Sequence, residues 1–367
     1  MTRIIISGGG TGGHVYPAIA IANALKMQEP GAEILFVGAK GKMEMEKVPE
    51  AGYQIKGLWV SGLQRRITWK NLSFPFKVIS STVEANRIIG RFDPEVVIGV
   101  GGYASGPTLR MAIRRKVPAL IQEQNSYPGL TNKLLGKKVD KICVAYEGME
   151  RFFPAEKIIL TGNPVRQDIV VPGDKTSAME HFRLNPGKKV VLVFGGSLGA
   201  GTINKSVLKC LENAGLLTDV QFLWQTGKYY FDAYKDDHRV HENKDVNILP
   251  FINRMDLAYA AADIIVCRAG AIAISEVCLT GKPVILIPSP NVAEDHQTKN
   301  AIALVKRSAA LMIRDQEAEN GLADLVKDLI NNNELQNVMK ENIKRLAIPD
   351  AADRIAAEAM KLAGTKK

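Results

Sequence analysis

The sequence predicts an α/β protein made of two doubly wound domains, and three observations lead to this prediction. Apolar strand patterns alternate with helical patterns along most of the chain, as in proteins with parallel sheets. A strand followed by a glycine-rich turn opens the chain and occurs again at 189–200. The length of 367 residues is enough for two cores of ordinary size.

The first half has strand patterns near 3–7, 33–37, 95–100, 118–122 and 141–145. The first of these runs into the turn Ser7–His14, and a helix is expected from about Pro17. Glycine has no Cβ and reaches positive φ at little cost, so backbone N–H groups in such a turn can approach a ligand. Because a helix N-terminus also favours anions, we expect a cradle for a phosphate or a sugar here.

The second half repeats this arrangement, with strand patterns at 189–194, 220–225, 246–249, 263–267 and 283–287. Its first strand enters the glycine turn Gly195–Ala200, so two similar Rossmann-like halves are the simplest interpretation. The turn-rich stretch 162–174 is the expected linker, which gives domains at 1–164 and 165–344. The end of the chain, 334–367, has a helical pattern.

The composition favours an anionic partner. Lys and Arg outnumber Asp and Glu by 48 to 38, a net charge of +10 that suits nucleic acid, an acidic membrane surface or a phosphorylated substrate. The four cysteines lack C-x-x-C spacing, as expected of reduced, buried thiols in the cytosol. The N-terminal apolar run ends at Ile6, and no stretch has the length of a membrane span, so any membrane contact is expected to be peripheral.

Polar or aromatic residues follow two central strands of the first half. Tyr103 stands at the tip of the turn 99–107, where it could line a substrate site beyond the carboxyl ends of the strands. The amide and carboxyl groups of Glu123, Gln124 and Asn125 suit sugar hydroxyls. The alternatives are a tight turn at 99–107 and a loop after Ile121 that bonds to its own backbone.

In the second half, the segment from Cys267 to Glu276 is a small-residue turn that opens a helix. Such a turn offers free N–H groups to a diphosphate. The two carboxylate oxygens of Glu276 could accept hydrogen bonds from both hydroxyls of a ribose. The alternative for Glu276 is a solvated carboxylate on the helix surface.

Three other classes of protein are consistent with single features. Gly195–Gly199 fits the G-x-S-x-G elbow of α/β-hydrolases, with Ser197 as nucleophile and Asp263 and His296 in the required order. The opening turn fits the dinucleotide fingerprint, but no acidic residue ends the second strand at 38–41, which argues against a nicotinamide site. A non-enzymatic protein that binds nucleic acid or membranes is suggested by the charge alone.

The order and completeness of the motifs resemble the GT-B glycosyltransferases, over nearly the whole chain, and among them the UDP-N-acetylglucosamine transferases that convert lipid I to lipid II. The stretches that carry the resemblance are Gly9–His14, Gly101–Tyr103, Glu123–Asn125, Gly162–Arg166, Gly195–Ala200 and Arg268–Gln297. One departure is Gln122, where many relatives have His, so no role of that histidine can be transferred to this chain.

The resemblance implies two Rossmann-like domains that face each other across a cleft, with 345–367 packing back on the first. It implies an inverting transferase that moves N-acetylglucosamine from UDP-N-acetylglucosamine to the muramyl 4-hydroxyl of undecaprenyl-linked lipid I, for peptidoglycan synthesis, cell shape and division. The enzyme would act at the cytoplasmic face of the bacterial inner membrane, as a peripheral protein without nucleic-acid partners. The chain has no Asp-x-Asp pair, and we expect no cofactor and no metal.

The resemblance also assigns residues to roles. The donor-binding positions are Thr11, Gly12, Gly13, Asn125, Arg166, Ser197, Ile252, Ala271, Ile272, Ala273, Ile274, Ser275, Glu276 and Gln297. Tyr103 and Glu123 are the expected acceptor-binding residues. Without a metal, Arg166, Ser197 and helix N-termini would stabilise the departing diphosphate. His14 is the best candidate for the catalytic base, because an imidazole has an unperturbed pKa near ~6.5; the alternative is a structural or substrate-orienting histidine.

A membrane-docking patch is expected where aromatic, aliphatic and basic residues occur together. Its members are Arg65, Arg66, Trp69, Lys70, Leu72 and Phe76. Such a mixture suits the interface of an anionic bilayer. Ile79 and Val83 continue the apolar repeat, and for them we expect a place on the core face of an amphipathic helix.

Overall fold

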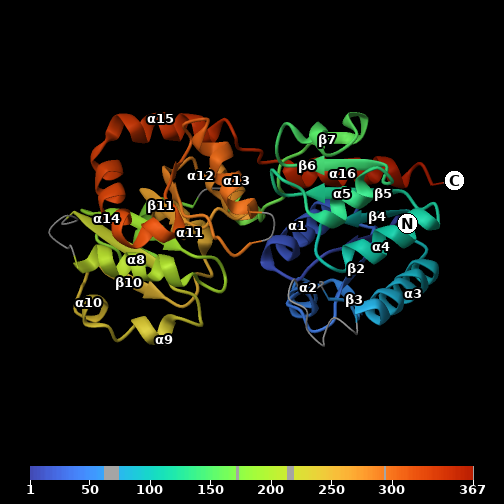
Figure 1. Ribbon diagram of the computed structural model, residues 1–367, viewed down its shortest axis with the longest axis horizontal. Coiled ribbons are helices and arrows are strands. Elements are labelled where there is room, and N and C mark those ends of the chain that lie inside the picture. Colours follow the sequence, from blue (N-terminus) through green and yellow to red (C-terminus); the bar gives the residue numbers. More distant parts are fainter. Residues whose placement is uncertain (62–73, 171–172, 213–218, 293–294, 367) are drawn as a thin grey trace. The chain divides into compact units, whose positions relative to one another are not determined.

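The computed structural model describes residues 1–61, 74–170, 173–212, 219–292 and 295–366. The chain forms two compact units (Figure 1), the first comprising Met1–Arg166 with Asp350–Lys367 and the second Gln167–Pro349. Each unit is built around its own parallel sheet, so the predicted α/β architecture with two doubly wound domains is confirmed.

The first unit contains a seven-stranded sheet in the order β3-β2-β1-β4-β5-β6-β7. Its strands are β1 (Arg3–Ser7), β2 (Glu33–Ala39), β3 (Gln54–Leu58), β4 (Val96–Gly99), β5 (Ala119–Glu123), β6 (Lys141–Val144) and β7 (Ile158–Leu160). All neighbours pair in parallel. The sequence pattern predicted five of these strands and missed the two edge strands. Strand β3 alternates exposed and half-buried residues, and β7 has only three residues.

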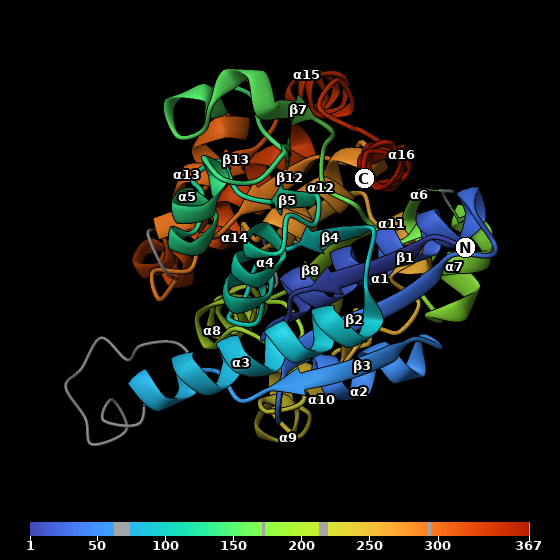
Figure 2. The ribbon, with the colours of Figure 1, turned by 90° about the vertical axis from the view of Figure 1, so that its right-hand side faces the viewer.

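Helices cover both faces of this sheet because successive strand residues point to opposite sides. They are α1 (Gly12–Gln28), α2 (Glu44–Glu50), α3 (Phe74–Phe92), α4 (Ser105–Arg114), α5 (Leu130–Gly136) and α16 (Ala351–Ala363). Ile4 and Ile6 pack in one core with α1 and α16, whereas Ile5 packs in the other with α3 and α4. Helices α3 and α4 lie side by side (Figure 2), and α16 packs on α1 although more than 300 residues separate them in sequence.

The second unit has a six-stranded parallel sheet in the order β10-β9-β8-β11-β12-β13. The strands are β8 (Lys189–Phe194), β9 (Val220–Gln225), β10 (Val246–Leu249), β11 (Ile264–Cys267), β12 (Val284–Leu286) and β13 (Leu311–Met312). The helices are α6 (Gln167–Val170), α7 (Lys175–His181), α8 (Gly201–Glu212), α9 (Phe231–Tyr234), α10 (His238–His241), α11 (Met255–Ala261), α12 (Ala271–Thr280), α13 (His296–Val305), α14 (Asp315–Asn331) and α15 (Asn333–Lys344). This order repeats that of the first six strands of the first unit.

In both units the strand order reverses beside the first strand, between β1 and β4 and between β8 and β11. Ligands of open α/β sheets bind at such a switch point, beyond the carboxyl ends of the strands. Both glycine turns that the sequence singled out lie there. Helix α1 begins at Gly12 rather than near Pro17, so Gly12 and Gly13 form its first turn and the turn before it is shorter than expected.

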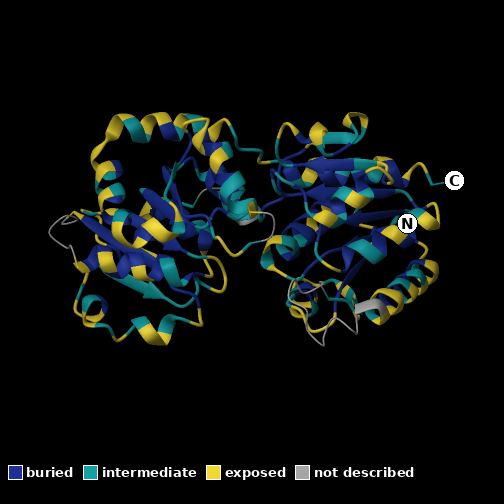
Figure 3. Ribbon diagram, in the orientation of Figure 1, coloured by how far each residue is buried: buried dark blue, intermediate teal, exposed yellow. Residues whose placement is uncertain are grey.

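The expectation that Ile79 and Val83 belong to the core face of α3 is wrong. They are 63% and 45% exposed, and Phe76 is 69% exposed. Exposed residues recur along α3 (Figure 3). The face of α3 that packs on the sheet carries Ala85, Ile88 and Ile89 instead. Apolar residues occur on two faces of α3. The small side chain of Ala85 lets the face with Ile88 and Ile89 approach the strands, so the face with Ile79 and Val83 is left exposed.

Among the described residues, none of the helices combines the length and the apolar character that crossing a bilayer requires.

Truncating a core residue of α16 should destabilise the first unit. Ile355 is fully buried in the core that α16 shares with α1 and the sheet. We expect Ile355→Ala to lower the free energy of unfolding by about 2 to 5 kcal/mol, measured by urea denaturation. Lys361→Ala, on the exposed side of the same helix, is the matched control. An Ile355→Ala variant as stable as the control would contradict this packing.

Candidate functional site

Two glycine turns of the first unit are in direct contact. Gly9 and Gly10 after β1 have positive φ values of 140° and 92°, and Gly102 after β4 has a φ of 84°. A Cβ on Gly102 would lie 2.2 Å from the carbonyl oxygen of Gly9. Only glycine therefore allows the two turns to approach each other at the switch point.

His14 lies where these two turns meet. Its Nδ1 is 3.2 Å from Oγ1 of Thr11, the residue that precedes α1. A Cβ on Gly101 would lie 2.8 Å from the imidazole Nε2, so the ring packs directly against that glycine. The contacts with Thr11 and Gly101 fix the ring at the carboxyl edge of the sheet.

The Glu123 carboxylate organises the loop after β5. It is buried, and it accepts hydrogen bonds from the backbone N–H groups of Asn125 (3.0 Å) and Gly129 (3.2 Å). It also accepts bonds from the side-chain amides of Asn125 (3.3 Å) and Asn132 (2.8 Å). Burial raises the pKa of this carboxyl, although the four hydrogen bonds oppose the shift. Glu123 thus bonds to its own loop, the alternative noted from the sequence.

Gln122 belongs to a buried network of amides. Its Nε2 donates to Oδ1 of Asn163 (2.9 Å), and its Oε1 accepts from Nε2 of Gln124 (2.8 Å). Gln124 donates to the carbonyl oxygen of Val100 (2.8 Å), and Asn163 donates to that of Gln124 (3.0 Å). Gln122 therefore links β5 to the turn after β4 and to the segment that leaves the first unit.

The remaining sequence-predicted residues of the first unit lie on the same edge of the sheet. Tyr103 is exposed at the tip of the turn after β4. Asn125 is held by Glu123, as described above. Arg166 is the last residue before the chain enters the second unit, and its guanidinium carbon is 5.9 Å from the ring centre of Tyr16 on α1.

The second unit repeats the contact between glycine turns. Gly199 after β8 and Gly227 after β9 have positive φ values of 80° and 87°. A Cβ on Gly199 would lie 2.0 Å from the carbonyl oxygen of Thr226, and a Cβ on Gly227 would lie 2.4 Å from the backbone nitrogen of Gly199. Gln225 braces this turn, since its Nε2 donates to the carbonyl oxygen of Gly196 (3.0 Å) and its Oε1 accepts from the Ile252 N–H (2.8 Å).

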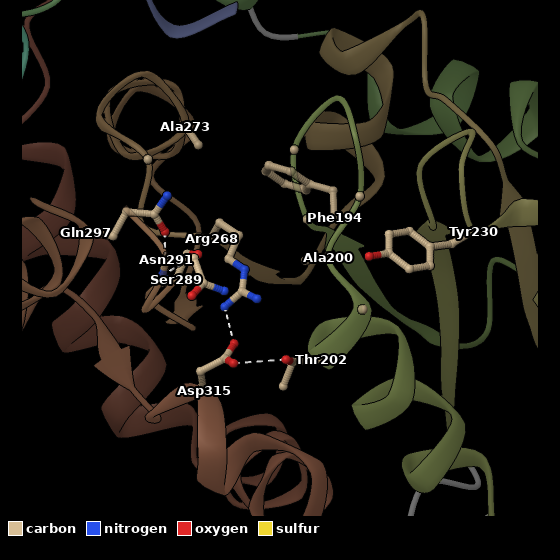
Figure 4. Close-up of a pocket in the computed structure, with 15 residues that line it drawn as sticks. Phe194, Ala200, Thr202, Tyr230, Arg268, Ala273, Ser289, Asn291, Gln297 and Asp315 are labelled. Atoms are coloured by element: carbon tan, nitrogen blue, oxygen red, sulfur yellow. Dashed lines mark hydrogen bonds and ion pairs between the residues drawn. The ribbon is translucent and has the colours of Figure 1, made fainter. Parts of the chain in front are cut away.

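A pocket of about 510 Å³ opens beside this turn (Figure 4). Its lining comes from the end of β8 and the turn after it, the start of α8, and the segments after β9, β11, β12 and β13. The residues are Phe194, Gly195, Gly196, Gly199, Ala200, Gly201, Thr202, Tyr230, Arg268, Gly270, Ala273, Ser289, Asn291, Gln297 and Asp315. Glycine backbone, hydroxyl, amide and guanidinium groups together suit a polar, anionic ligand.

An ion pair between Arg268 and Asp315 crosses the pocket wall (Figure 4). Nη1 of Arg268 also donates to the carbonyl oxygens of Ile287 (3.0 Å) and Pro288 (3.2 Å). The other oxygen of Asp315 accepts from Oγ1 of Thr202 (2.9 Å). The cluster joins the end of β11 to the first turns of α8 and α14 and fixes the guanidinium in the wall.

Only some of the sequence-predicted donor residues of the second unit line this pocket. Ala273 and Gln297 line the pocket, and the side-chain oxygen of Gln297 accepts from the Ser289 N–H (2.8 Å). Ser197 is exposed in the glycine turn. The structure places the run Ala271, Ile272, Ala273, Ile274, Ser275 and Glu276 in the first turns of α12.

Within that run, Ile274 packs in the core, so only its backbone could meet a ligand. Glu276 accepts a hydrogen bond from the Tyr259 hydroxyl at 2.9 Å, so its carboxylate is held in place. The Ile252 side chain is also buried, in the same core as Ile274.

The hydrolase alternative is excluded by the topology. Ser197 follows the carboxyl end of β8, whereas Asp263 precedes the amino end of β11, and the two strands are parallel neighbours. Six residues of strand separate the two edges by about 20 Å. Asp263 instead pairs with Lys175 (2.8 Å) and accepts from the Val190 N–H (2.9 Å).

Several residues in and around the pocket carried no signal in the sequence. Thr202 and Asp315 line the pocket, and Gln225 braces the glycine turn beside it; all three belong to no motif and meet the site only through the tertiary fold. Arg268 belongs to the stretch Arg268–Gln297, which carries the resemblance. Its position directly after β11 was the feature of the sequence that could have indicated a place in the site. Among the described residues, no three His, Cys, Asp or Glu side chains come close enough together to hold a metal ion.

Five residues of the expected membrane patch, Arg65, Arg66, Trp69, Lys70 and Leu72, lie outside the described residues. The sixth, Phe76, is exposed on α3.

Comparisons with known proteins give a consistent result. Residues 4–144 match the glycosyltransferase family 28 N-terminal domain, and residues 190–355 match its C-terminal domain. The chain is 55% identical to the UDP-N-acetylglucosamine--N-acetylmuramyl-(pentapeptide) pyrophosphoryl-undecaprenol N-acetylglucosamine transferase of Bacteroides fragilis, over 98% of this chain and 96% of that protein. It is 53% identical to the transferase of the same name from Flavobacterium psychrophilum, over 100% and 99%. The crystal structure of Acinetobacter baumannii MurG is similar with a TM-score of 0.76 and 28% identity, covering 98% of this chain and 100% of that one.

The raised pKa of Glu123 predicts a specific pH dependence of stability. The unfolded carboxyl ionises near pH ~4.3, and the folded one only at higher pH. The free energy of unfolding therefore decreases as the pH rises from the pKa of the unfolded state through the pKa of the folded state. Urea denaturation across this range should show that loss in wild type and not in Glu123→Gln. Parallel pH profiles of the two proteins would contradict the assignment.

Proposed function

Because the chain belongs to glycosyltransferase family 28, we propose that it transfers N-acetylglucosamine from UDP-N-acetylglucosamine to the muramyl 4-hydroxyl of lipid I, which forms lipid II. The observation that carries the proposal is the pocket of the second unit, at the switch point of its sheet. Its glycine backbone and guanidinium group suit a nucleotide diphosphate. The product would serve peptidoglycan synthesis.

Most of the donor contacts are assigned to the second unit. The glycine turn after β8, with Ser197, and the first turns of α8 and α12 offer N–H and hydroxyl groups to the diphosphate. Glu276, held by Tyr259, accepts from the ribose hydroxyls. Gln297, which lines the pocket, and the backbone near Ile252, which bonds to Gln225, complete the proposed donor contacts. Protein groups alone stabilise the charge on the departing UDP in this scheme.

The first unit supplies the acceptor side of the reaction. The 4-hydroxyl oxygen attacks the anomeric carbon on the face opposite the diphosphate, so the configuration inverts as the bond to UDP breaks. His14 takes the hydroxyl proton, and UDP leaves with the bonding electrons. If Nδ1–H donates to Thr11 Oγ1, the basic nitrogen is Nε2, beside Gly101. Tyr103 and Glu123 border the same edge as acceptor residues, with Glu123 acting through the loop that it holds. Asn125 and Arg166 lie at this edge as donor-binding positions.

The acceptor carries a lipid, so we also propose peripheral docking on an anionic membrane through the exposed face of α3. Phe76, Ile79 and Val83 recur at helical spacing and are exposed. Lys77 lies between them in sequence, with its Nζ 5.7 Å from the ring centre of Trp59. Apolar side chains with neighbouring cations suit the boundary between lipid headgroups and acyl chains.

Ligand-induced stabilisation tests the donor class. UDP should raise the melting temperature, by an amount that grows with the logarithm of its concentration once this exceeds the Kd, whereas NAD should leave it unchanged. A serine-reactive fluorophosphonate should not label Ser197. Stabilisation by NAD, or covalent labelling of Ser197, would overturn the transferase proposal.

Removing the ribose contact should weaken donor binding. Hydrogen bonds to a charged group contribute about 1.5 to 3 kcal/mol, so we expect Glu276→Ala to raise the Kd for UDP by roughly 10- to 100-fold in calorimetric titrations. Glu276→Gln keeps one acceptor for Tyr259 and should have an intermediate effect. Glu334→Ala, on α15, is the control. A wild-type Kd in Glu276→Ala would exclude the ribose role.

Removing the proposed base should impair turnover rather than donor binding. We expect His14→Ala to lower kcat by roughly 10² to 10⁴, while the Kd for UDP changes little. The readout is UDP release in the presence of a lipid I analogue. A kcat close to that of wild type would exclude His14 as the base and would indicate a structural or substrate-orienting role.

Polar substitutions on α3 should reduce membrane binding. Phe76→Ser combined with Ile79→Ser should lower the fraction that sediments with anionic phospholipid vesicles, without changing the affinity for UDP. Met27→Ser combined with Val338→Ser removes exposed apolar side chains elsewhere and serves as the control. Equal sedimentation of both double variants would exclude α3 as the docking face.

A further inference from the structure

The carboxylate of Glu44 is buried beside the glycine turn that carries His14. Glu44 is the first residue of α2 and is only 2% exposed. Its Oε2 accepts from the Gly10 N–H at 2.8 Å, and its Oε1 accepts from the Ala39 N–H at 2.9 Å. Within the described ranges, no Lys, Arg or His side chain pairs with it. Two backbone donors therefore satisfy this buried charge.

The neighbouring glycines leave room for this side chain. A Cβ on Gly9 would lie 2.2 Å from Cδ of Glu44, and a Cβ on Gly38 would lie 2.6 Å from its Cγ. Any other residue at either position would displace the carboxylate. The end of β2 and the turn after β1 are thus both shaped around Glu44.

The turn is held from its other side as well. Gly102 contacts Gly9, and Gly101 packs against the His14 ring. The segment from Gly9 to His14 therefore lies between the Glu44 carboxylate and the turn after β4. A shift of Gly10 would move Thr11 and His14 with it, because Thr11 leads directly into α1.

We propose that Glu44 is a positioning residue for the reaction: it holds the glycine turn so that Thr11 and His14 are correctly placed. The inference rests on the proposed function, which it deepens. A carboxylate is needed because both partners are N–H donors. The amide of a Gln has one acceptor oxygen, and its NH₂ group would face one of the two N–H groups.

Two measurements on the full chain test this inference. The first is hydrogen exchange of the amides of residues 9–14, which needs no activity. Glu44→Gln should speed this exchange by about 10-fold or more, while the turn at 195–201 exchanges as in wild type. The second is turnover with a lipid I analogue, where kcat should fall by about 10²-fold with an unchanged Kd for UDP. Glu46→Gln, exposed on the same helix, is the matched control.

Gly38→Ala displaces the same side chain by another route. Its effect on kcat should resemble that of Glu44→Gln, and the double variant should be no worse than the more impaired single variant. Unchanged exchange at 9–14 in Glu44→Gln would overturn the inference. So would a variant with a lower melting temperature but a normal kcat, because Glu44 would then have only a structural role. If wild type itself shows no turnover, the proposed function fails, and the exchange data still decide whether Glu44 holds the turn.

Discussion

The structure depends on the close approach of backbone to backbone at the carboxyl edge of each sheet. In the first unit the turns after β1 and β4 touch at Gly9 and Gly102, and in the second the turns after β8 and β9 touch at Gly199 and Gly227. No side chain fits at these contacts. The carboxyl edges of both sheets consequently present main-chain N–H groups, helix N-termini and a few fixed side chains, which is the chemistry that a sugar nucleotide and its acceptor require.

Buried polar groups around these turns are satisfied in three different ways. Glu44 and Glu123 each accept only from N–H donors of nearby backbone and amides. Gln122 shares bonds with other amides. Arg268 is paired with Asp315 inside a pocket wall. Each set of hydrogen bonds orders a loop that the sheet alone would not hold in place. The polar groups therefore determine the shape of the site, and the apolar strands determine its location.

The sequence predicted features that depend on local pattern. Continuous apolar strands such as β1 and β8, and the glycine turns after them, are visible in a few residues. The edge strands β3 and β13 were missed because they are half-buried or very short. The predicted orientation of α3 was wrong because apolar residues occur on two of its faces, and only packing against the sheet decides which face is buried. Glu44, Gln225 and Asp315 could not be predicted, since each meets the site from a distant segment.

The central claim is that this chain transfers N-acetylglucosamine from UDP-N-acetylglucosamine to lipid I. The most direct measurement is the rate of UDP release from UDP-N-acetylglucosamine with and without a lipid I analogue, with the sugar product identified by mass spectrometry. The account predicts UDP release that depends on the acceptor, with one N-acetylglucosamine gained by the acceptor for each UDP released. UDP release at the same rate without the acceptor, or no release with both substrates present, would contradict it.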